Sequence, residues 1–258
     1  MSPHILQSVG LKKDFRGFTA VAGVDLGVTR GTIHALIGPN GAGKTTFFNL
    51  LTKFLRPSGG RILFEGEDVT DLQPAMLARK GLVRSFQISA VFPHMSALEN
   101  VRLALQRKLG LDYAFWRSQR VLAQLHDEAM HYLCEVGMES KAEVAAADLP
   151  YGSKRALELA TALASDPKVL LLDEPTQGMA HEDLDRIIAL VRRVARRRTV
   201  LMVEHNMRIV SELADHISVL QRGALIASGS YAEVARNPLV VEAYMGTGAG
   251  TLGAPAFG

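Results

Sequence analysis

The sequence has a single cysteine and no long hydrophobic segment. Cys134 cannot form a disulfide within the chain, so the chain fits a reducing compartment, and Cys134 is expected to be a small buried hydrophobic residue. Apolar runs such as VLLL at 169–172 are far shorter than the roughly 20 residues of a membrane-spanning helix. The N-terminal segment MSPHILQSVGLKKDF lacks the layout of a signal peptide. These absences predict a soluble cytoplasmic protein.

Repeats and a strong net charge are also lacking. The 258 residues are 48% apolar, which is enough for one sizeable core, and they show no internal repeat. The net charge of +3 permits an anionic partner, such as a nucleotide, a membrane surface or nucleic acid, without choosing among them. The Gly- and Ala-rich tail, about 247–258, is expected to be flexible.

Short apolar runs alternate with helical patterns along most of the chain. Apolar residues spaced by three and four predict helices within 95–137 and over 183–194. This alternation predicts an α/β fold with a largely parallel sheet, and the strand-free middle is interpreted as an inserted helical lobe. Strands are predicted at 21–28, 33–37, 61–64, 169–172, 199–203 and 217–220.

A phosphate-binding motif follows one of these predicted strands. GPNGAGKTT at 38–46 matches G-x-x-x-x-G-K-[ST], with an apolar strand before it and a helical pattern after it. Backbone N–H groups of the glycine-rich loop and the positive end of the following helix would bind phosphates. Lys44 would reach the β- and γ-phosphates, and Thr45 would offer a hydroxyl to Mg²⁺. An ordinary glycine-rich turn is the alternative, against which the complete motif argues. The predicted nucleotide-binding residues here are Gly38, Pro39, Asn40, Gly41, Ala42, Gly43, Lys44, Thr45 and Thr46.

Two acids end the predicted strand at 169–172. Asp173 is placed to hold Mg²⁺ through water, and Glu174 to polarise a water molecule aimed at the γ-phosphate. A pair of solvated loop acids is the alternative. Downstream of a phosphate-binding loop, the pair predicts ATP hydrolysis rather than binding alone. The absence of G-x-G-x-x-G at the loop disfavours a dinucleotide-dependent dehydrogenase.

Two further polar residues end strand-like stretches. His205 follows Glu204 at the end of the strand 199–203, which is predicted to lie beside the first acidic strand. This raises the prospect that His205 faces the γ-phosphate, with a structural histidine as the alternative. Gln87 closes GLVRSFQ, and its amide could contact both the metal and the attacking water.

Four pieces of sequence together resemble the ATP-binding subunits of ABC transporters. In order, they are GPNGAGKTT, Gln87, LPYGS at 149–153, and VLLLDEP followed by His205. The resemblance extends over about 5–246 and implies that Gln87 is the Q-loop glutamine, His205 the switch histidine and 177–180 the D-loop. Phe15, in KKDFRG, falls where the family stacks an aromatic ring on adenine, and an ordinary core aromatic is an equal alternative.

The resemblance also implies a domain layout. It predicts a P-loop NTPase (RecA-like) core with an antiparallel β subdomain and an inserted α-helical subdomain. A single ATPase domain would span 1–246, with the core at about 1–87 and 160–246 and the helical lobe at about 88–159.

LPYGS stands in the place of the family's signature LSGGQ, which begins a helix that faces the γ-phosphate of ATP on a second subunit. Pro150 replaces the serine and brings neither a hydroxyl nor an N–H group. Gly152, and the free N–H groups of a helix predicted to begin near Ser153, would still favour an anion. Ser153, in place of the glutamine, could cap that helix or replace the lost hydroxyl. The Tyr151–Gly152 pair resembles importers of branched-chain amino acids.

Three further segments resemble the branched-chain amino acid and urea importer branch. They are FPHMSALENV (92–101), LDYAFWRSQR (111–120) and ARNPLVVEAYMG (235–246), with ordinary amphipathic helices as the alternative. The resemblance implies an energy-coupling ATPase for branched-chain amino acids or a related small polar solute. A separately encoded permease would dock near the Q-loop, with Phe92, Met95 and Leu98 as candidate contacts and surface-loop packing as the alternative.

The implied setting is the cytoplasmic face of the inner membrane, as a peripheral subunit that uses ATP and Mg²⁺. A second ATPase subunit, identical or related, would complete a head-to-tail dimer, and a periplasmic solute-binding protein would act indirectly.

No nucleic acid is expected, because RRVARRR at 192–198 is interpreted as a basic helix end. His126 and His131 lack metal-ligand spacing. The sequence leaves open the solute and a homodimer or heterodimer of ATPases.

Two other classes of ABC ATPase remain alternatives. One serves lipid or lipopolysaccharide export, and the Tyr–Gly signature and closing helix argue against it. The other acts outside transport, in DNA repair or on ribosomes. It usually has a long coiled coil or two ATPase domains in one chain, and neither pattern occurs in this sequence.

Overall fold

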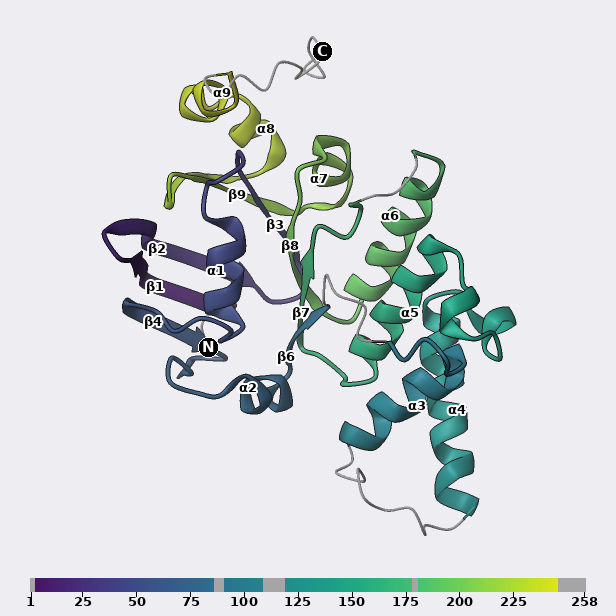
Figure 1. The fold of residues 1–258 in the computed structure, drawn as a ribbon. Helices are drawn as coiled ribbons and strands as arrows, with labels where there is room; N and C mark the ends of the chain where they lie inside the picture. Colours follow the sequence, from purple (N-terminus) through teal and green to yellow (C-terminus); the bar gives the residue numbers. More distant parts are fainter. Residues whose placement is uncertain (1–2, 86–90, 109–118, 178–180, 246–258) are drawn as a thin grey trace.

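The computed structural model describes residues 3–85, 91–108, 119–177 and 181–245. Its centre is a six-stranded sheet with the strand order β10-β9-β3-β8-β7-β6 (Figure 1). The strands from β9 to β6 are parallel, and β10 runs antiparallel to β9. The strands are β3 (Ile33–Ile37), β6 (Leu82–Ser85), β7 (Val169–Asp173), β8 (Thr199–Val203), β9 (His216–Gln221) and β10 (Ala224–Gly229).

The central strands β3, β7 and β8 are buried along their whole length. Their side chains alternate between two core clusters, one on each face of the sheet. On β7, Leu170 and Leu172 join one cluster, while Val169 and Leu171 join the other. Strands covered on both faces require continuous apolar runs, which is why these segments of the sequence lack polar alternation.

A second, antiparallel sheet has the order β2-β1-β4-β5. The helix α1 (Lys44–Leu51) buries Phe47, Phe48 and Leu50 in the cluster shared by both sheets, so it packs between them (Figure 1). This sheet contains β1 (His4–Phe15), β2 (Phe18–Thr29), β4 (Gly59–Phe64) and β5 (Glu67–Asp68), and α2 (Pro74–Lys80) precedes β6.

Helices cover the other face of the six-stranded sheet. Of these, α3, α4 and α5 pack against one another at the lower right of Figure 1. Two short 3₁₀ helices, Glu139–Lys141 and Ala146–Asp148, connect α4 to α5. The α-helices from α3 onward are α3 (Ala97–Lys108), α4 (Gln119–Glu135), α5 (Tyr151–Leu163), α6 (His181–Ala195), α7 (Met207–Leu213), α8 (Tyr231–Ala235) and α9 (Pro238–Met245).

The α/β class and the largely parallel sheet are confirmed. The predicted strands 33–37 and 199–203 coincide with β3 and β8, and the other predicted strands lie within elements that extend by one or a few residues. The domain boundaries stay a prediction. Gln87, most of the 111–120 segment and the tail after Met245 lie outside the described residues.

Two predictions about burial are wrong. Cys134 is exposed, because the buried stripe of α4 runs through Leu125, Ala129 and Leu133, and the residue after Leu133 points away from it. Leu98 is only 3% exposed and lies in the core, so it is not a candidate surface contact for a permease.

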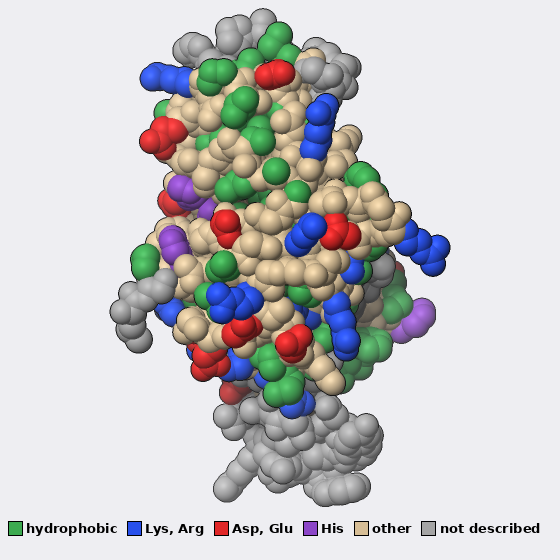
Figure 2. Space-filling view, turned by 90° about the vertical axis from the view of Figure 1, so that its left-hand side faces the viewer, with side chains coloured by type: hydrophobic (Ala, Val, Ile, Leu, Met, Phe, Trp, Pro, Cys, Tyr) green, Lys and Arg blue, Asp and Glu red, His purple; other side chains and the backbone are tan. Residues whose placement is uncertain are grey.

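The surface carries intermixed charges. On the face seen in Figure 2, basic and acidic side chains alternate without a continuous basic area. Glu65, for example, pairs with both Arg30 at 2.9 Å and Lys168 at 2.5 Å.

No helix among the described residues combines the length and the apolar composition needed to cross a bilayer.

Candidate active site

The loop between β3 and α1 has a backbone that only glycine can adopt at two positions. Gly43, the N-cap of α1, has a φ of 100°, and Gly38 has a φ of 152°. A Cβ at Gly38 would collide with the backbone carbonyl of Leu220, and one at Gly43 with that of Ala20. The glycines of the motif are therefore required by packing against neighbouring strands as well as by the expected approach of phosphate.

Lys44 opens α1 and turns back over the loop. Its Nζ donates hydrogen bonds to the carbonyl oxygens of Gly38 at 2.6 Å and Pro39 at 3.0 Å, and the residue is 8% exposed. Burial lowers the pKa of Lys44, and the charges of Glu174 and Asp173 act in the opposite direction. The structure therefore brings Lys44 into electrostatic contact with both acids that follow β7.

Asp173 is the last residue of β7 and is buried. One of its oxygens, Oδ2, forms an ion pair with the guanidinium of Arg84 from the neighbouring strand β6. Arg84 also donates to Oδ1 of Asn49 on α1 at 2.6 Å, and its guanidinium carbon lies 5.9 Å from the ring centroid of Phe48. Arg84 was not predicted from the sequence. The feature that could have indicated it is a cationic residue within the short strand β6.

Glu174 stands at a sharp change of chain direction. Its φ of 46° is in the left-handed region, and its N–H donates to the carbonyl of Val203 at the end of β8 at 3.0 Å. Its Oε1 lies 3.9 Å from Nδ1 of His205, and the two side chains are 23% and 58% exposed. The prediction that His205 ends a strand next to the acidic strand is confirmed, since β7 and β8 pair in parallel.

Glu204 is fully buried and joins the segments that follow β7 and β8. Its Oε1 accepts hydrogen bonds from the hydroxyl of Thr176 at 2.6 Å and from the N–H of Thr176 at 3.2 Å. Its Oε2 accepts from the N–H groups of His205 at 3.0 Å and Asn206 at 3.3 Å. The sequence analysis did not predict this positioning role of Glu204. The feature that could have indicated it is an acid directly after an apolar strand.

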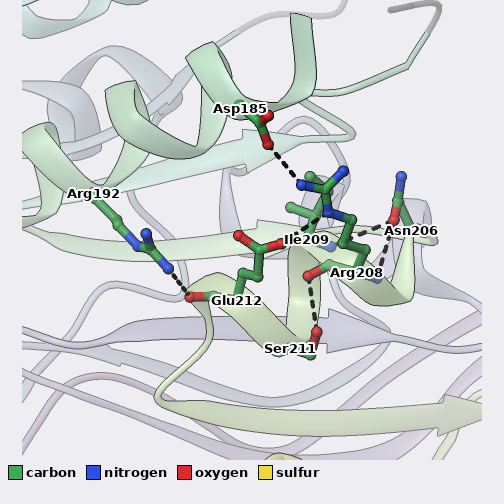
Figure 3. A network of polar contacts seen from close by, with 7 residues as sticks. All are labelled: Asp185, Arg192, Asn206, Arg208, Ile209, Ser211 and Glu212. Carbon is green, nitrogen blue, oxygen red and sulfur yellow. Dashed lines mark hydrogen bonds and ion pairs between the residues drawn. The ribbon is translucent and has the colours of Figure 1, made fainter. Parts of the chain in front are cut away.

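The helix α7 begins directly after His205 and is anchored to α6 (Figure 3). Oδ1 of Asn206 caps α7 by accepting from the N–H groups of Arg208 at 3.1 Å and Ile209 at 3.4 Å. The side chain of Arg208 then reaches Asp185 on α6 at 2.7 Å and Glu212 at 2.9 Å. This network holds the backbone on the C-terminal side of His205.

The signature segment begins α5 earlier than predicted. The helix starts at Tyr151 with Pro150 as its N-cap, and no side chain caps it. Ser153 therefore lies within the first turn, and the prediction that it could cap the helix is wrong, because Pro150 already occupies that position. Its hydroxyl accepts a hydrogen bond from Nζ of Lys141 at 2.7 Å. Gly152 lies beside it in the same turn.

Other predicted residues lie apart from this group. Phe15 ends β1 in the antiparallel sheet, is 41% exposed and has Nζ of Lys13 5.0 Å from its ring centroid. Phe92 is 53% exposed and Met95 is partly buried. Most of the predicted D-loop lies outside the described residues.

The residues present fit a hydrated Mg²⁺. The hydroxyl of the exposed Thr45 and the carboxylate of Asp173 are hard oxygen donors, which suit this ion. Within the described parts of the chain, no group of three or more His, Cys, Asp or Glu side chains could form a metal site by itself. Thr45 and Asp173 match the way proteins bind Mg²⁺, with one or two protein ligands and the rest from phosphates and water.

Known proteins match this chain over nearly its whole length. The family model described as ABC transporter matches residues 21–177, and the model described as Branched-chain amino acid ATP-binding cassette transporter matches residues 224–250. The high-affinity branched-chain amino acid transport ATP-binding protein BraF of Pseudomonas aeruginosa is 40% identical over 256 residues, which cover 95% of this chain and 99% of BraF. LivG of Escherichia coli K12, which bears the same description, is 37% identical over 254 residues, or 95% and 99% of the two chains.

Solved structures agree with this assignment. The ADP conformation of MJ1267, an ATP-binding cassette of an ABC transporter, has a TM-score of 0.83 and 31% identity over 94% of this chain and 99% of its own. A nucleotide-free cassette of an ABC transporter has a TM-score of 0.81 and 30% identity over 93% and 98%. The motifs, the parallel sheet and these likenesses lead to one conclusion: the chain belongs to the family of ABC transporter ATP-binding subunits, which hydrolyse ATP to power transport.

Proposed function

We propose that this chain is the energy-coupling ATPase of an ABC importer for branched-chain amino acids or a related small polar solute. The observation that carries the proposal is the C-terminal segment 224–250, which resembles the branched-chain amino acid branch in addition to the general ATPase motifs. Likeness to BraF and LivG over 95% of the chain supports it. Lipid export and non-transport roles are not favoured.

We retain the proposal of a single ATPase domain over 1–246 with a helical lobe at about 88–159.

The phosphate-binding loop would hold ATP. Its backbone N–H groups and the first turn of α1 favour phosphate, and Lys44 supplies a positive charge there. Thr45 and Asp173 would hold Mg²⁺, which supplies charge neutralisation between the phosphates when bound. Arg84 keeps the Asp173 carboxylate oriented through its ion pair. Phe15 would stack on adenine, and its exposure leaves the ring accessible.

Glu174 is the proposed general base. A carboxylate at 23% exposure can reach a water molecule and accept its proton as the oxygen attacks the γ-phosphate. His205, 3.9 Å from this carboxylate, is placed to orient the same region of the site. Gln87 is proposed to contact the metal and the attacking water.

Two partners are proposed. A second ATPase subunit would present the first turn of its α5, with Gly152 and Ser153, to the nucleotide bound by this chain. A separately encoded permease would contact the exposed Phe92 and its neighbour Met95 at the cytoplasmic side of the membrane. A periplasmic solute-binding protein would deliver the solute to the permease and would not touch this chain.

The proposal is tested by solute uptake in the source organism with Lys44→Ala introduced at the native gene. We expect high-affinity uptake of labelled leucine, isoleucine and valine to be lost, while Arg79→Ala, a change at an exposed residue on α2, retains at least half of the uptake. Lost uptake of urea or an amide with normal leucine uptake would assign another solute. Normal uptake of every tested solute would overturn the importer proposal.

A further inference from the structure

Tyr151 connects the start of α5 with the turn that follows β7, two segments that belong to different ATPase motifs. It is the first residue of α5 and is 47% exposed, yet its hydroxyl is used within the chain. The hydroxyl donates a hydrogen bond of 2.7 Å to the carbonyl oxygen of Gln177, three residues after Glu174. The signature helix is therefore bonded directly to the turn that carries the proposed base.

That turn is held from both sides. The N–H of Gln177 donates to the carbonyl of Glu174 at 3.0 Å, which closes the turn around the left-handed Glu174. On the strand side, the hydroxyl of Thr176 donates to the buried Glu204. On the helix side, the hydroxyl of Tyr151 donates to the carbonyl of Gln177, which links the position of the turn to the start of α5.

Arg155 fixes the orientation of Tyr151. Its Nη2 and Nε donate to the Tyr151 oxygen at 3.1 and 3.3 Å, and its guanidinium carbon lies 5.4 Å from the ring centroid. Nη1 donates to the buried Glu158 at 2.8 Å, which holds the guanidinium in place. A phenol oxygen that accepts from a cation becomes a stronger donor, so this arrangement strengthens the bond to Gln177.

The bond depends on a position at which this signature differs from LSGGQ, within the Tyr–Gly pair that resembles importers of branched-chain amino acids. The family signature has glycine where this chain has Tyr151, and glycine has no side chain that could reach Gln177. The substitution therefore adds a contact, while Pro150 removes a hydroxyl one position earlier.

We propose that Tyr151 is a positioning residue that couples the first turn of α5 to the turn carrying Glu174. The inference rests on the proposed function, in which α5 faces the nucleotide of a second subunit and Glu174 acts on the nucleotide of its own chain. When α5 settles on the partner's nucleotide, the hydroxyl of Tyr151 places the Glu174 turn. The two nucleotide sites of a dimer then respond to one another.

Tyr151→Phe removes only the hydroxyl and tests the coupling. We expect the kcat for ATP hydrolysis to fall about fivefold, as for the loss of one hydrogen bond, and the Hill coefficient for ATP to approach one. Affinity for a fluorescent ADP analogue should stay within twofold. Amide hydrogen exchange in a peptide covering 174–177 should become faster. Arg155→Lys should shift kcat and exchange in the same direction by less.

Tyr132→Phe, on α4 in the same group of helices, is the matched control and should leave all four readouts unchanged. A Tyr151→Phe protein with wild-type kcat, Hill coefficient and exchange would overturn the inference. If the wild-type chain hydrolyses no ATP with Mg²⁺ by itself, the rates are measured with the related ATPase subunit added, and no hydrolysis in that complex would overturn the proposed function instead. In that case the exchange rates alone would decide whether Tyr151 holds the turn, and unchanged exchange would overturn the inference as well.

Discussion

Lys44 is the residue at which burial and charge act most directly against each other. Burial lowers its pKa, while Glu174 and Asp173 favour its charged form. Arg84 places a second cation against Asp173, so positive and negative groups alternate around the end of β7. A buried charge that loses its partner is costly, so removing either Arg84 or Asp173 should destabilise the fold as well as disturb the nucleotide site.

Lys44→Ala should abolish ATP hydrolysis and weaken nucleotide binding strongly, because it removes the positive charge from the loop that would hold the phosphates. A fluorescent ATP analogue would measure the dissociation constant, and phosphate release would measure the rate. Retained hydrolysis in this variant would contradict the assignment of the phosphate-binding loop.

Glu174→Gln should retain ATP binding and slow hydrolysis by roughly 10²–10⁴-fold, the usual size for the loss of a general base. Single-turnover hydrolysis with bound ATP separates the chemical step from binding. Glu143→Gln, a change at an exposed glutamate, is the control and should hydrolyse ATP at the wild-type rate. An unchanged rate for Glu174→Gln would remove Glu174 from the role of base.

His34 should make the protein less stable in acid. Burial, together with the charges of His216 and His4, lowers the pKa of His34 to about 3, while in the unfolded chain it is about 6.5. From about pH 6.5 down towards 3 the unfolded state therefore binds a proton that the folded state does not. The free energy of unfolding should fall by up to about 1.4 kcal/mol per pH unit from this residue.

Urea unfolding at about pH 7, 6 and 5 measures this slope. His34→Gln should flatten it, because glutamine does not titrate, whereas the control His126→Gln, at an exposed histidine, should keep the wild-type slope. Equal slopes in wild type and His34→Gln would contradict the prediction.

At the scale of elements, helix starts and strand ends position the site. The pairing of β7 with β8 sets Glu174 and His205 side by side, and Glu204 joins the segments after both strands. The cap of α7 and its ion pair to α6 hold the chain that follows His205 (Figure 3). The site therefore depends on side chains that have no direct role in the chemistry.

Asn206→Ala should lower the free energy of unfolding by about 1 kcal/mol, because two N–H groups at the start of α7 lose their acceptor. It should also lower the rate of ATP hydrolysis, since His205 is the preceding residue. Thermal unfolding and steady-state hydrolysis measure the two effects. Ser211→Ala, in the same helix, is the control and should stay within about 0.5 kcal/mol of wild type with normal hydrolysis. Loss of stability with wild-type hydrolysis would separate the cap from the site.

At the scale of the whole molecule, the phosphate-binding loop and the signature helix α5 are separate parts of the chain. In the proposed dimer, each nucleotide would contact the loop of one subunit and α5 of the other. The first turn of α5 has free N–H groups and no side-chain cap, as an anion-binding helix start requires, but Pro150 supplies no hydroxyl. Whether two copies of this chain suffice for a closed dimer is therefore a direct test of the altered signature.

The Glu174→Gln protein should double its mass in light scattering with ATP and Mg²⁺ and stay monomeric with ADP, because slowed hydrolysis preserves the ATP-bound state. Doubling would establish the homodimer as a working state in spite of LPYGS. A monomer with ATP bound would mean that the signature needs a different ATPase subunit as its partner. The matched control is Lys44→Ala, which should stay monomeric in ATP.

The sequence alone determined the α/β class, the phosphate-binding loop and the acidic strand end. These features depend on local chemistry: a complete loop motif, and apolar runs long enough for buried parallel strands and too short for a membrane. The predictions for Cys134 and Leu98 were wrong because one rested on residue type and the other on a resemblance, and neither took account of which side of its helix the residue occupies.

Only the tertiary structure decided which distant side chains meet. Arg84 and Asp173 are far apart in the chain, as are Tyr151 and Gln177, and no spacing rule predicts such pairs. Strand order and helix packing set these contacts, because they depend on which elements become neighbours. The start of α5 was likewise decided by the backbone at Pro150, so Ser153 became a first-turn residue bonded to Lys141. Local motifs thus identify the chemistry, and the fold determines the residues that hold it in place.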